Sequence, residues 1–307
     1  MVIVLEKVLV LLSTYNGEKY LYEQLDSILA QEGVDVSILV RDDGSADRTI
    51  SILQEYSLKY ANIKYYQGCN LKPAKSFLEL ISVAEESPYY ALCDQDDVWD
   101  KDKLIGAINV LKTMNDNIPL LYHSNVRVVD ENLNFIRLLN MHPRVHRNKY
   151  AALLEPMVLG CTSVFNFQAK KYIARRMPKY CSMHDTWIYM VCIIFGNVFY
   201  DASPHMSYRQ HSDNVIGVYA KINTRLVLSK LKMMLDAHVQ PRYCNAISFY
   251  ECFYDVMGKE ESKKVKKIIN YKDSWYNTFS LLLDMDLRAS SLLKDLRNKF
   301  RILARII

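Results

Sequence analysis

The chain has 307 residues, of which 50% are hydrophobic and 24% charged, and it carries a net charge of +5. This balance is typical of a globular protein and excludes the disordered and fibrous classes. The longest uncharged apolar stretches, such as residues 191–200, fall short of the roughly 20 residues that a membrane-spanning helix needs, so the sequence predicts no span.

The charge is unevenly distributed along the chain. From Lys221 onward there are 17 Lys and Arg against 9 Asp and Glu, whereas the first 220 residues hold 22 against 25. A basic tail behind a slightly acidic body predicts an anionic partner, such as a phospholipid surface or a lipid diphosphate. A nucleic-acid partner is excluded, because the sequence pI of 8.6 is below that typical of such domains and no helix-turn-helix or zinc-finger pattern is present.

The cysteines and the first residues indicate a reducing compartment. The number of cysteines, seven, is odd, and no two of them form a C-x-x-C pair. Residues 1–12 are interrupted by two charged residues and alternate like a strand, so we interpret them as structure and not as a signal peptide. These features predict reduced thiols and a cytoplasmic protein.

Apolar periodicity in the first third of the chain predicts strands that alternate with helices. The chain has no internal repeat and no long linker, so we expect residues 1–220 to form one body and residues 221–307 a basic helical extension. Strands separated by helices of this length indicate an α/β fold with a mostly parallel central sheet that is flanked by helices. The predicted strands are residues 8–12, 37–41, 63–66 and 89–93, and the predicted helices are residues 17–31, 45–60 and 74–85.

Polar and acidic residues follow three of these strands, at the edge where ligands bind in parallel sheets. Taken alone, the segment Asp42–Ser45 is typical of a turn followed by a helix cap. The segment Asp94–Asp97 is different, because it holds three carboxylates within four residues directly after a buried strand. Such carboxylates repel one another unless a cation neutralises them, so this segment predicts a divalent metal site.

With these segments in view, the chain resembles the family 2 glycosyltransferases, and within them the bacterial polysaccharide rhamnosyltransferase-like group. The resemblance implies the GT-A fold, which is Rossmann-like, over roughly residues 7–220, and a catalytic domain that spans residues 1–220. It becomes vague in the tail. The segments that carry it are 12–17, 41–45, 93–99, 183–185, 208–211 and 214–217.

The resemblance also implies roles for single residues. It implies that Thr14, Tyr15 and Asp43 hold the nucleotide base and ribose, and that Asp42 lies beside them. Two segments depart from the pattern. Residues 70–73 read Asn-Leu-Lys-Pro where many relatives carry a glycine shortly after the asparagine, and Thr186 stands where an aromatic residue often follows the Met-His-Asp triplet.

The resemblance further identifies Asp94 and Asp96 as the two carboxylates of a DxD motif. We expect Asp96 to bind Mg²⁺ or Mn²⁺ directly and Asp94 to contact the ribose or metal-bound water. The ion would stabilise the charge that grows on the departing diphosphate. His211 is the candidate for a further metal ligand or a phosphate contact, its alternative being a hydrogen-bonded histidine at a loop end. Arg209 is the candidate for bidentate phosphate binding.

An inverting transferase needs a base that takes the proton of the incoming hydroxyl. Asp185 is our candidate, because it matches the family motif and stands at the start of the apolar segment 186–195, which reads as a buried helix. The alternative is that Asp185 only complements the helix dipole. We interpret the adjacent His184 as a packing neighbour.

The predicted reaction is the inverting transfer of a sugar from a nucleoside-diphosphate sugar to a hydroxyl of a lipid-linked or oligosaccharide acceptor, in bacterial cell-surface polysaccharide synthesis. From the resemblance alone, the first choice of sugar is L-rhamnose carried on dTDP. One alternative is a sugar nucleotidyltransferase, against which the single glycine in residues 13–17 argues. The other is a non-catalytic nucleotide-binding scaffold.

The C-terminal region shows helical periodicity. Leu292, Leu296, Phe300, Leu303 and Ile307 form one stripe, with basic residues roughly opposite. Two interpretations stay open: the stripe packs on the protein core, or the helix lies on the anionic inner face of the cell membrane as a peripheral anchor. A homodimer interface is compatible with the same pattern. The second apolar segment of the tail comprises Leu226, Leu228, Leu231, Met234 and Leu235.

Overall fold

The computed structural model describes residues 5–139, 148–155, 157–211 and 240–307. The chain divides into two compact units. The first comprises Met1–Pro143, Met157–Met177 and Met183–Arg209, and the second Arg144–Pro156, Pro178–Ser182 and Gln210–Ile307. The predicted boundary after residue 220 and the apolar segment 226–235 lie outside the described residues, so the predicted division stays a prediction.

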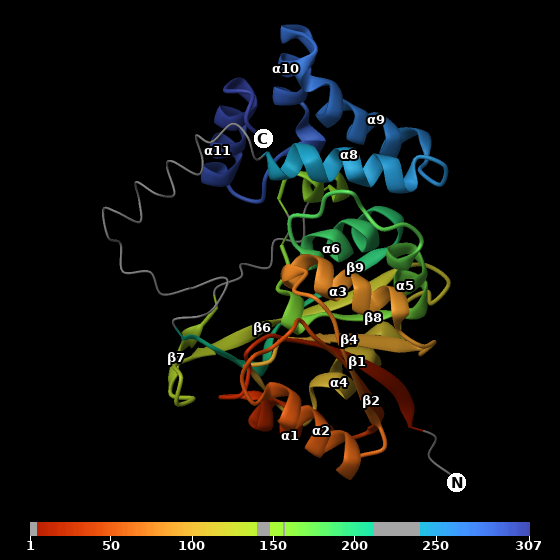
Figure 1. Cartoon of the computed structure of the whole chain (residues 1–307). Helices are drawn as coiled ribbons and strands as arrows, with labels where there is room; N and C mark the ends of the chain where they lie inside the picture. Colours follow the sequence, from red (N-terminus) through yellow and green to blue (C-terminus); the bar gives the residue numbers. More distant parts are fainter. Residues whose placement is uncertain (1–4, 140–147, 156, 212–239) are drawn as a thin grey trace. The chain divides into compact units, whose positions relative to one another are not determined.

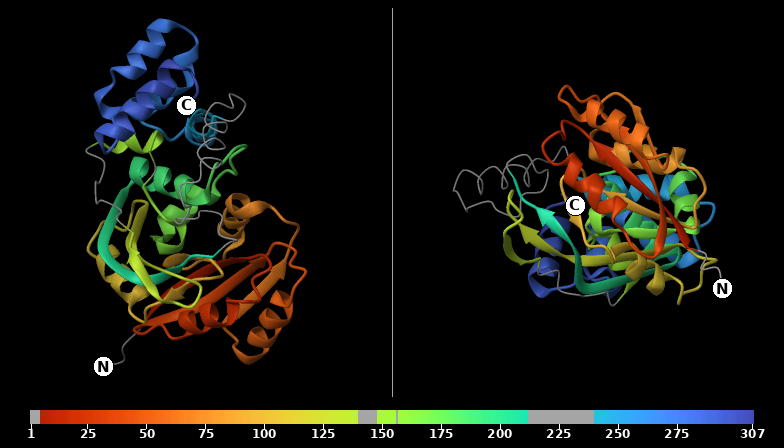
Figure 2. Two further views of the ribbon diagram at one scale, coloured as in Figure 1. Left: turned by 90° about the vertical axis from the view of Figure 1, so that its left-hand side faces the viewer. Right: turned by 90° about the horizontal axis from the view of Figure 1, so that it is seen from below.

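The strands of the first unit form one curled sheet, which Figure 2 shows from two sides. Among the described residues this sheet has nine strands, eight of them in the order β3-β2-β1-β4-β8-β6-β9-β5, while β7 pairs with β6. The strands β3, β2, β1 and β4 run parallel. The bounds are β1 Glu6–Thr14, β2 Val34–Asp42, β3 Ile63–Gln67, β4 Tyr89–Cys93, β5 Val98–Trp99, β6 Leu120–Val129, β7 Phe135–Leu138, β8 Val164–Asn166 and β9 Asn197–Arg209.

The helices of the first unit cover both faces of the sheet. The chain steps from β1 to β2 to β3 in one direction and then returns to β4, so right-handed connections put α1 and α2 on one face and α3 on the other. Figure 1 shows this arrangement. The bounds are α1 Leu21–Leu29, α2 Thr49–Lys59, α3 Lys72–Val83, α4 Lys103–Leu111, α5 Phe167–Ala174 and α6 His184–Phe195.

The sequence pattern explains most of these elements. The core of β1, Val8–Leu12, is apolar throughout and buried, as expected of a parallel strand covered on both faces. The helix α6 is apolar on all sides and is buried over most of its length, as predicted. The predicted α/β class with a mostly parallel sheet is confirmed.

Two helices begin later than the periodicity predicts. The first, predicted from Gly17, begins at Leu21, because the chain turns at Asn16, which has a φ of +49°. The second, predicted from Ser45, begins at Thr49, because the Ser45 side chain bonds to Asp42 in the preceding loop. In both places loop contacts override the helical periodicity.

The second unit contains α-helices and short 3-10 helices. Its longer helices are α8 Pro241–Phe253, α9 Lys259–Ile269, α10 Trp275–Leu282 and α11 Leu292–Leu303. Helix α8 packs against α9, and α10 against α9 and α11. No helix among the described residues has the length and hydropathy that crossing a bilayer would require.

Candidate active site

The direction of chain connection reverses between β1 and β4, and this switch point is where doubly wound sheets bind their ligands. Leu12 of β1 pairs with Cys93 of β4, so the loops after these strands lie next to each other. The Gln95 side chain joins them: its Oε1 accepts from the Tyr15 N–H at 2.8 Å, and its Nε2 donates to the Tyr15 carbonyl at 3.1 Å. Residues 94–97 are thereby fixed against the first loop.

Asp42 is buried, and the loop that it begins fills its hydrogen-bonding capacity. One carboxylate oxygen accepts from the backbone N–H groups of Gly44, at 3.0 Å, and Ser45, at 2.9 Å. The other accepts from the hydroxyls of Thr14, at 3.0 Å, and Ser45, at 2.5 Å. Gly44 has a φ of +82°, which few other residues adopt. Asp42 therefore shapes the rim of the site and has no spare acceptor in this arrangement.

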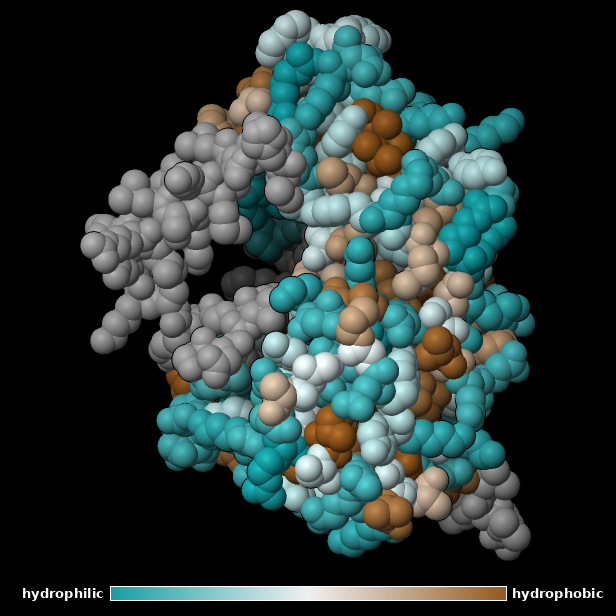
Figure 3. Space-filling view, in the orientation of Figure 1, coloured by the Kyte–Doolittle hydropathy of each residue, from teal (hydrophilic) through white to brown (hydrophobic). Residues whose placement is uncertain are grey.

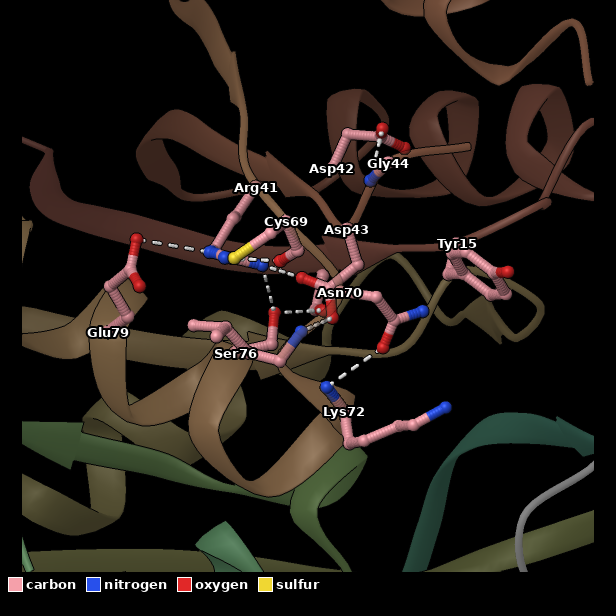
Figure 4. A network of polar contacts seen from close by, with 12 residues as sticks. Tyr15, Arg41, Asp42, Asp43, Gly44, Cys69, Asn70, Lys72, Ser76 and Glu79 are labelled. Atoms are coloured by element: carbon pink, nitrogen blue, oxygen red, sulfur yellow. Dashed lines mark hydrogen bonds and ion pairs between the residues drawn. The ribbon is translucent and has the colours of Figure 1, made fainter. Parts of the chain in front are cut away.

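Asp43 belongs to a second polar network, drawn in Figure 4. Its carboxylate forms an ion pair with buried Arg41 and accepts from the Leu71 N–H at 3.1 Å. The same guanidinium bonds to Glu79 at 3.1 Å and to the Cys69 carbonyl at 3.0 Å. A side chain at residue 68 would collide with Arg41, since a Cβ there would lie 2.6 Å from the guanidinium, so glycine is required. The network ties the second loop to the third.

Tyr15, Asn70 and Lys72 lie beside this network in Figure 4. Lys72 has a φ of +66°, in the left-handed region that favours glycine, and its N–H donates to the Asn70 side chain at 3.1 Å. The segment 70–73 therefore keeps the backbone of a glycine turn although it lacks the glycine. Tyr15 is 48% exposed, so its ring is accessible to a planar base.

The acidic loop 94–97 has a different electrostatic character. Asp94 and Asp96 are half-buried and Asp97 is fully buried. Burial, followed by the charges of Asp96 and Asp185, raises the pKa of Asp94 to about 7. Burial and the charges of Asp96 and Asp94 hold the pKa of Asp97 well above its usual range. Burial is the larger cause of both pKa shifts, and the crowding of negative charges adds to it.

These acids fit a hard divalent cation. Asp94, Asp97 and Cys161 each offer a ligand atom, and these atoms lie within 4.8 Å of one another. One oxygen of Asp97, Oδ2, is buried and has no hydrogen-bond partner in the described part of the chain. Carboxylate oxygens suit Mg²⁺ and Mn²⁺ better than the sulfur does, so the carboxylates would hold the ion. Asp96 is not a member of this triad, and its assignment as first ligand stays a prediction.

One buried cation lies close to these acids. Lys103, at the start of α4, has its ammonium 3.7 Å from the centre of the Trp99 ring and no hydrogen-bond partner among the described residues. Burial lowers the pKa of Lys103 to about 8, while the neighbouring Cys161, Cys93 and Asp97 act to raise it. Lys103 thus partly balances the acidic loop from below. Lys103 and Gln95 were not among the residues predicted from the sequence, where the one available signal was their place in the segment 94–103.

Asp185 lies in the first turn of α6 and is buried. Its Oδ1 accepts from the Thr186 N–H at 2.5 Å. Burial raises the pKa of Asp185 to about 6, although hydrogen bonds from the backbone of Thr186 and Gly160 oppose the shift. Because the charge of Asp185 also raises the pKa of Asp94, the fold brings two carboxylates from residues 91 positions apart within electrostatic reach.

His184 packs beside this carboxylate. Its ring centre lies 4.1 Å from that of Phe77, and neither ring nitrogen has a hydrogen-bond partner in the described residues. Burial lowers the pKa of His184 to about 3, so the ring is neutral. A Cβ at residue 160 would lie 2.5 Å from the ring, so Gly160 allows this approach. The arrangement agrees with a packing role.

Arg209 ends β9 and lies beneath the acidic loop. Its backbone N–H donates to Asp97 at 3.1 Å, its Nε to the Asp96 carbonyl at 2.8 Å and its Nη1 to the Glu131 carbonyl at 2.6 Å. Its Nη2 forms an ion pair with Glu23. These bonds make Arg209 a positioning residue for the loop, and phosphate binding by Arg209 stays a prediction.

His211 belongs to the second unit. Its assignment as a metal ligand or a phosphate contact therefore also stays a prediction.

Comparison with known proteins gives this geometry a family. The family model described as glycosyl transferase family 2 matches residues 9–173. A dTDP-rhamnosyl transferase, RfbG, of Shigella flexneri is 32% identical over 67% of this chain and 73% of its own length. An uncharacterized glycosyltransferase of Rickettsia typhi is 25% identical over 66% of this chain and 63% of its own length.

Solved structures share the fold. The crystal structure of S. aureus TarS 1-349 in complex with UDP-GlcNAc has a TM-score of 0.57 and 18% identity, and the match covers 96% of this chain and 90% of that one. The mannosyltransferase PcManGT of Pyrobaculum calidifontis, in complex with GDP-Man and Mn²⁺, has a TM-score of 0.54 and 14% identity, over 97% of this chain and 80% of that one. The family model and the Shigella relative together confirm the resemblance: the chain is a glycosyltransferase and belongs to glycosyl transferase family 2.

Proposed function

We propose that the protein is an inverting, metal-dependent glycosyltransferase that moves L-rhamnose from dTDP-rhamnose to a hydroxyl of a lipid-linked or oligosaccharide acceptor. The observation that carries this proposal is the placement of Asp185 within electrostatic reach of Asp94 at the switch point of the sheet. A donor that leaves as a diphosphate needs a cation at the acids, and an incoming hydroxyl needs a base close to them.

The nucleotide would occupy the edge built by the first three loops. Tyr15 is accessible for stacking on the base, whereas Asp43 and Thr14 are buried and would meet the base and ribose at the floor of this edge. Asp42 would contribute through the shape of its loop, because its oxygens already accept four hydrogen bonds. The choice of dTDP-rhamnose rests on the name of the Shigella relative.

The diphosphate would face the acidic loop. Asp94 and Asp96 would hold Mg²⁺ or Mn²⁺, with Asp97 behind them and His211 as a further ligand. When bound, the ion supplies charge stabilisation to the leaving diphosphate. The manganese in the mannosyltransferase structure supports a divalent ion of this kind. Arg209 would keep the loop in place through its bonds to residues 96 and 97.

Transfer would proceed by a single displacement. The acceptor oxygen forms a bond to the anomeric carbon, the bond from that carbon to the diphosphate oxygen breaks, and the hydroxyl proton moves to the Asp185 carboxylate. With a pKa raised to about 6, Asp185 is ionised at neutral pH and is still a better base than an ordinary aspartate. A lipid-linked acceptor would place the enzyme at the inner face of the cell membrane, as a peripheral protein, in bacterial cell-surface polysaccharide synthesis.

The test is a transfer assay on the purified chain with dTDP-rhamnose, Mn²⁺ and a rhamnosyl-acceptor oligosaccharide. We expect release of dTDP that stops with EDTA, and a product whose anomeric configuration by NMR is opposite to that of the donor. Other sugar nucleotides, run in parallel, identify the donor. If none of the sugar nucleotides supported transfer or donor hydrolysis, the result would favour the non-catalytic scaffold.

A further inference from the structure

The outer side of α11 is apolar although it faces away from the packed part of the second unit. Asn298 and Ile302 are the buried residues of the helix, so a polar side chain lies inside. The other apolar residues of the helix turn outward and are between 42% and 80% exposed, while Ile307, beyond the helix end, is buried. Within the described residues of the second unit, the helical part of the stripe is therefore not packed, and the choice between the two sequence-based interpretations stays a prediction. The outward residues are Leu292, Leu293, Leu296, Phe300 and Leu303.

Helix α10 continues this surface. It packs against α11, and the Arg305 guanidinium lies 5.2 Å from the centre of the Trp275 ring. In Figure 3, apolar atoms reach the surface at the upper left, where Figure 1 places α11. We call these exposed apolar residues together the outer face of α10 and α11. On the α10 side, four residues are each at least half exposed: Trp275, Tyr276, Phe279 and Leu283.

Unpaired arginines border the outer face. On a helical projection Arg297 and Arg301 follow the apolar arc of α11 on one edge. Neither forms an ion pair within the described residues. Arg242 of α8 adds a third guanidinium: after burial, the charges of Arg301 and Arg297 lower its pKa, with Glu155 opposing. That acid is already bonded to Ser290 and Lys294. Among the described residues, the cluster therefore carries more positive charge than its one neighbouring acid, Glu155, can balance.

The charge decides which occupant fits this face. A second copy of the chain, docked with the two α11 helices antiparallel about a two-fold axis, would bring the same arginines toward each other and add to the repulsion. The face needs negative charge for its arginines and an apolar surface for its exposed side chains. An anionic lipid bilayer supplies both, because its headgroups carry phosphate oxygens and its acyl boundary accepts apolar side chains. Arginine forms bidentate hydrogen bonds with phosphate.

We propose that the outer face of α10 and α11 docks onto an anionic phospholipid surface, with Phe300 and its apolar neighbours at the boundary of the acyl chains and with Arg297 and Arg301 on lipid phosphates. This proposal deepens the peripheral location within the proposed function. It rests on the second unit alone and needs no substrate, so it can fail while transfer activity stands, and the reverse also holds.

The experiment is co-sedimentation of the full chain with vesicles of phosphatidylcholine, with and without 30 mol% phosphatidylglycerol. We expect the chain to bind the anionic vesicles at least tenfold more tightly than the neutral ones. High salt should reduce this binding to the level that the apolar contacts alone sustain. The double variant Arg297→Ser/Arg301→Ser should bind the anionic vesicles about tenfold more weakly. Phe300→Ser/Leu296→Ser should weaken binding at both salt concentrations.

The matched control is Lys259→Ser/Lys266→Ser, which removes the same charge from exposed positions of α9 in the same unit. It should bind like the unmodified chain. Equal loss in the control and arginine variants, or equal binding to both vesicle types, would overturn the proposal. So would a dimer in light scattering that Phe300→Ser/Leu296→Ser dissociates, or a fall in the unfolding temperature of that variant without vesicles, because the face would then pack on protein.

Discussion

Asp42 and Asp97 are both buried aspartates in loops that follow parallel strands of one sheet, but their surroundings differ. Asp42 accepts four hydrogen bonds from its own loop and from Thr14. Asp97 accepts one from the Arg209 backbone, keeps a buried oxygen without a hydrogen-bond partner in the described chain, and shares its loop with Asp94 and Asp96. A carboxylate whose bonds are filled builds the loop, whereas a group of underneutralised carboxylates has the chemistry to attract a cation.

The largest expected effect concerns Asp185, the predicted general base. Asp185→Asn should reduce transfer about 1000-fold, because it removes a general base and leaves the side-chain shape. Binding of the nucleotide donor, measured by calorimetry, should change by less than about twofold, because the substitution leaves the contacts that bind the donor before the reaction unchanged. Transfer within tenfold of the unmodified enzyme would exclude Asp185 as the base.

Removal of the Asp42 carboxylate, whose oxygens accept four hydrogen bonds, should affect the fold. Asp42→Ala leaves four donors without their acceptor and should lower the free energy of unfolding by about 3 kcal/mol, measured by urea titration. Asp42→Asn retains one acceptor and should lose less. If both variants matched the unmodified protein in stability, the hydrogen bonds assigned to Asp42 would not hold the loop.

The surroundings of Asp42 and Asp97 also show which features could be predicted from the sequence and which could not. Apolar runs and helix spacing predicted the parallel strands and buried α6, because burial on both faces leaves a direct pattern. Asp185 was selected by its motif and helix position. The different states of Asp42 and Asp97 could not be predicted, since hydrogen bonds from Thr14 and Arg209 depend on residues 28 and 112 positions away.

The tail shows a further limit of sequence reasoning. The stripe of α11 was evident from periodicity, but its direction was not, because a sequence pattern does not tell which side of a helix meets the core. The buried Asn298 in the structure decides that direction.

Lys103 is the buried cation next to Asp97, so its removal tests how far the acidic loop depends on a positive charge. Lys103→Met removes the buried cation near Asp97 at nearly constant volume and should lower the free energy of unfolding by about 2 kcal/mol at pH 7, where an ammonium with a pKa of about 8 is mostly charged, because the acids lose a counter-charge. Adding Asp97→Asn should recover much of that loss. A double-mutant cycle measures this coupling, and additive effects of the two changes would contradict it.

The smallest expected effect has the opposite sign. Without a divalent ion, Asp94→Asn should raise the free energy of unfolding by about 1 kcal/mol at pH 8, a shift of about 2–4 °C in unfolding temperature. The pKa of Asp94 is raised to about 7 in the fold, so the ionised form costs stability above that pH. The gain should shrink as the pH falls from 7 and vanish below the ordinary aspartate pKa of 3.8, where folded and unfolded Asp94 are both protonated. A destabilised variant at pH 8 would show that this charge is already compensated.

The most direct test of the account is the binding of Mn²⁺ in the presence of dTDP, followed by calorimetry on four proteins of equal concentration. We predict one ion per chain for the unmodified protein, with at least tenfold weaker binding for Asp94→Asn and Asp96→Asn and binding within twofold for Asp35→Asn, which changes an exposed aspartate at the opposite end of β2. If Asp35→Asn and Asp96→Asn weaken binding equally, or if the unmodified chain binds no ion, the acidic loop is not a metal site.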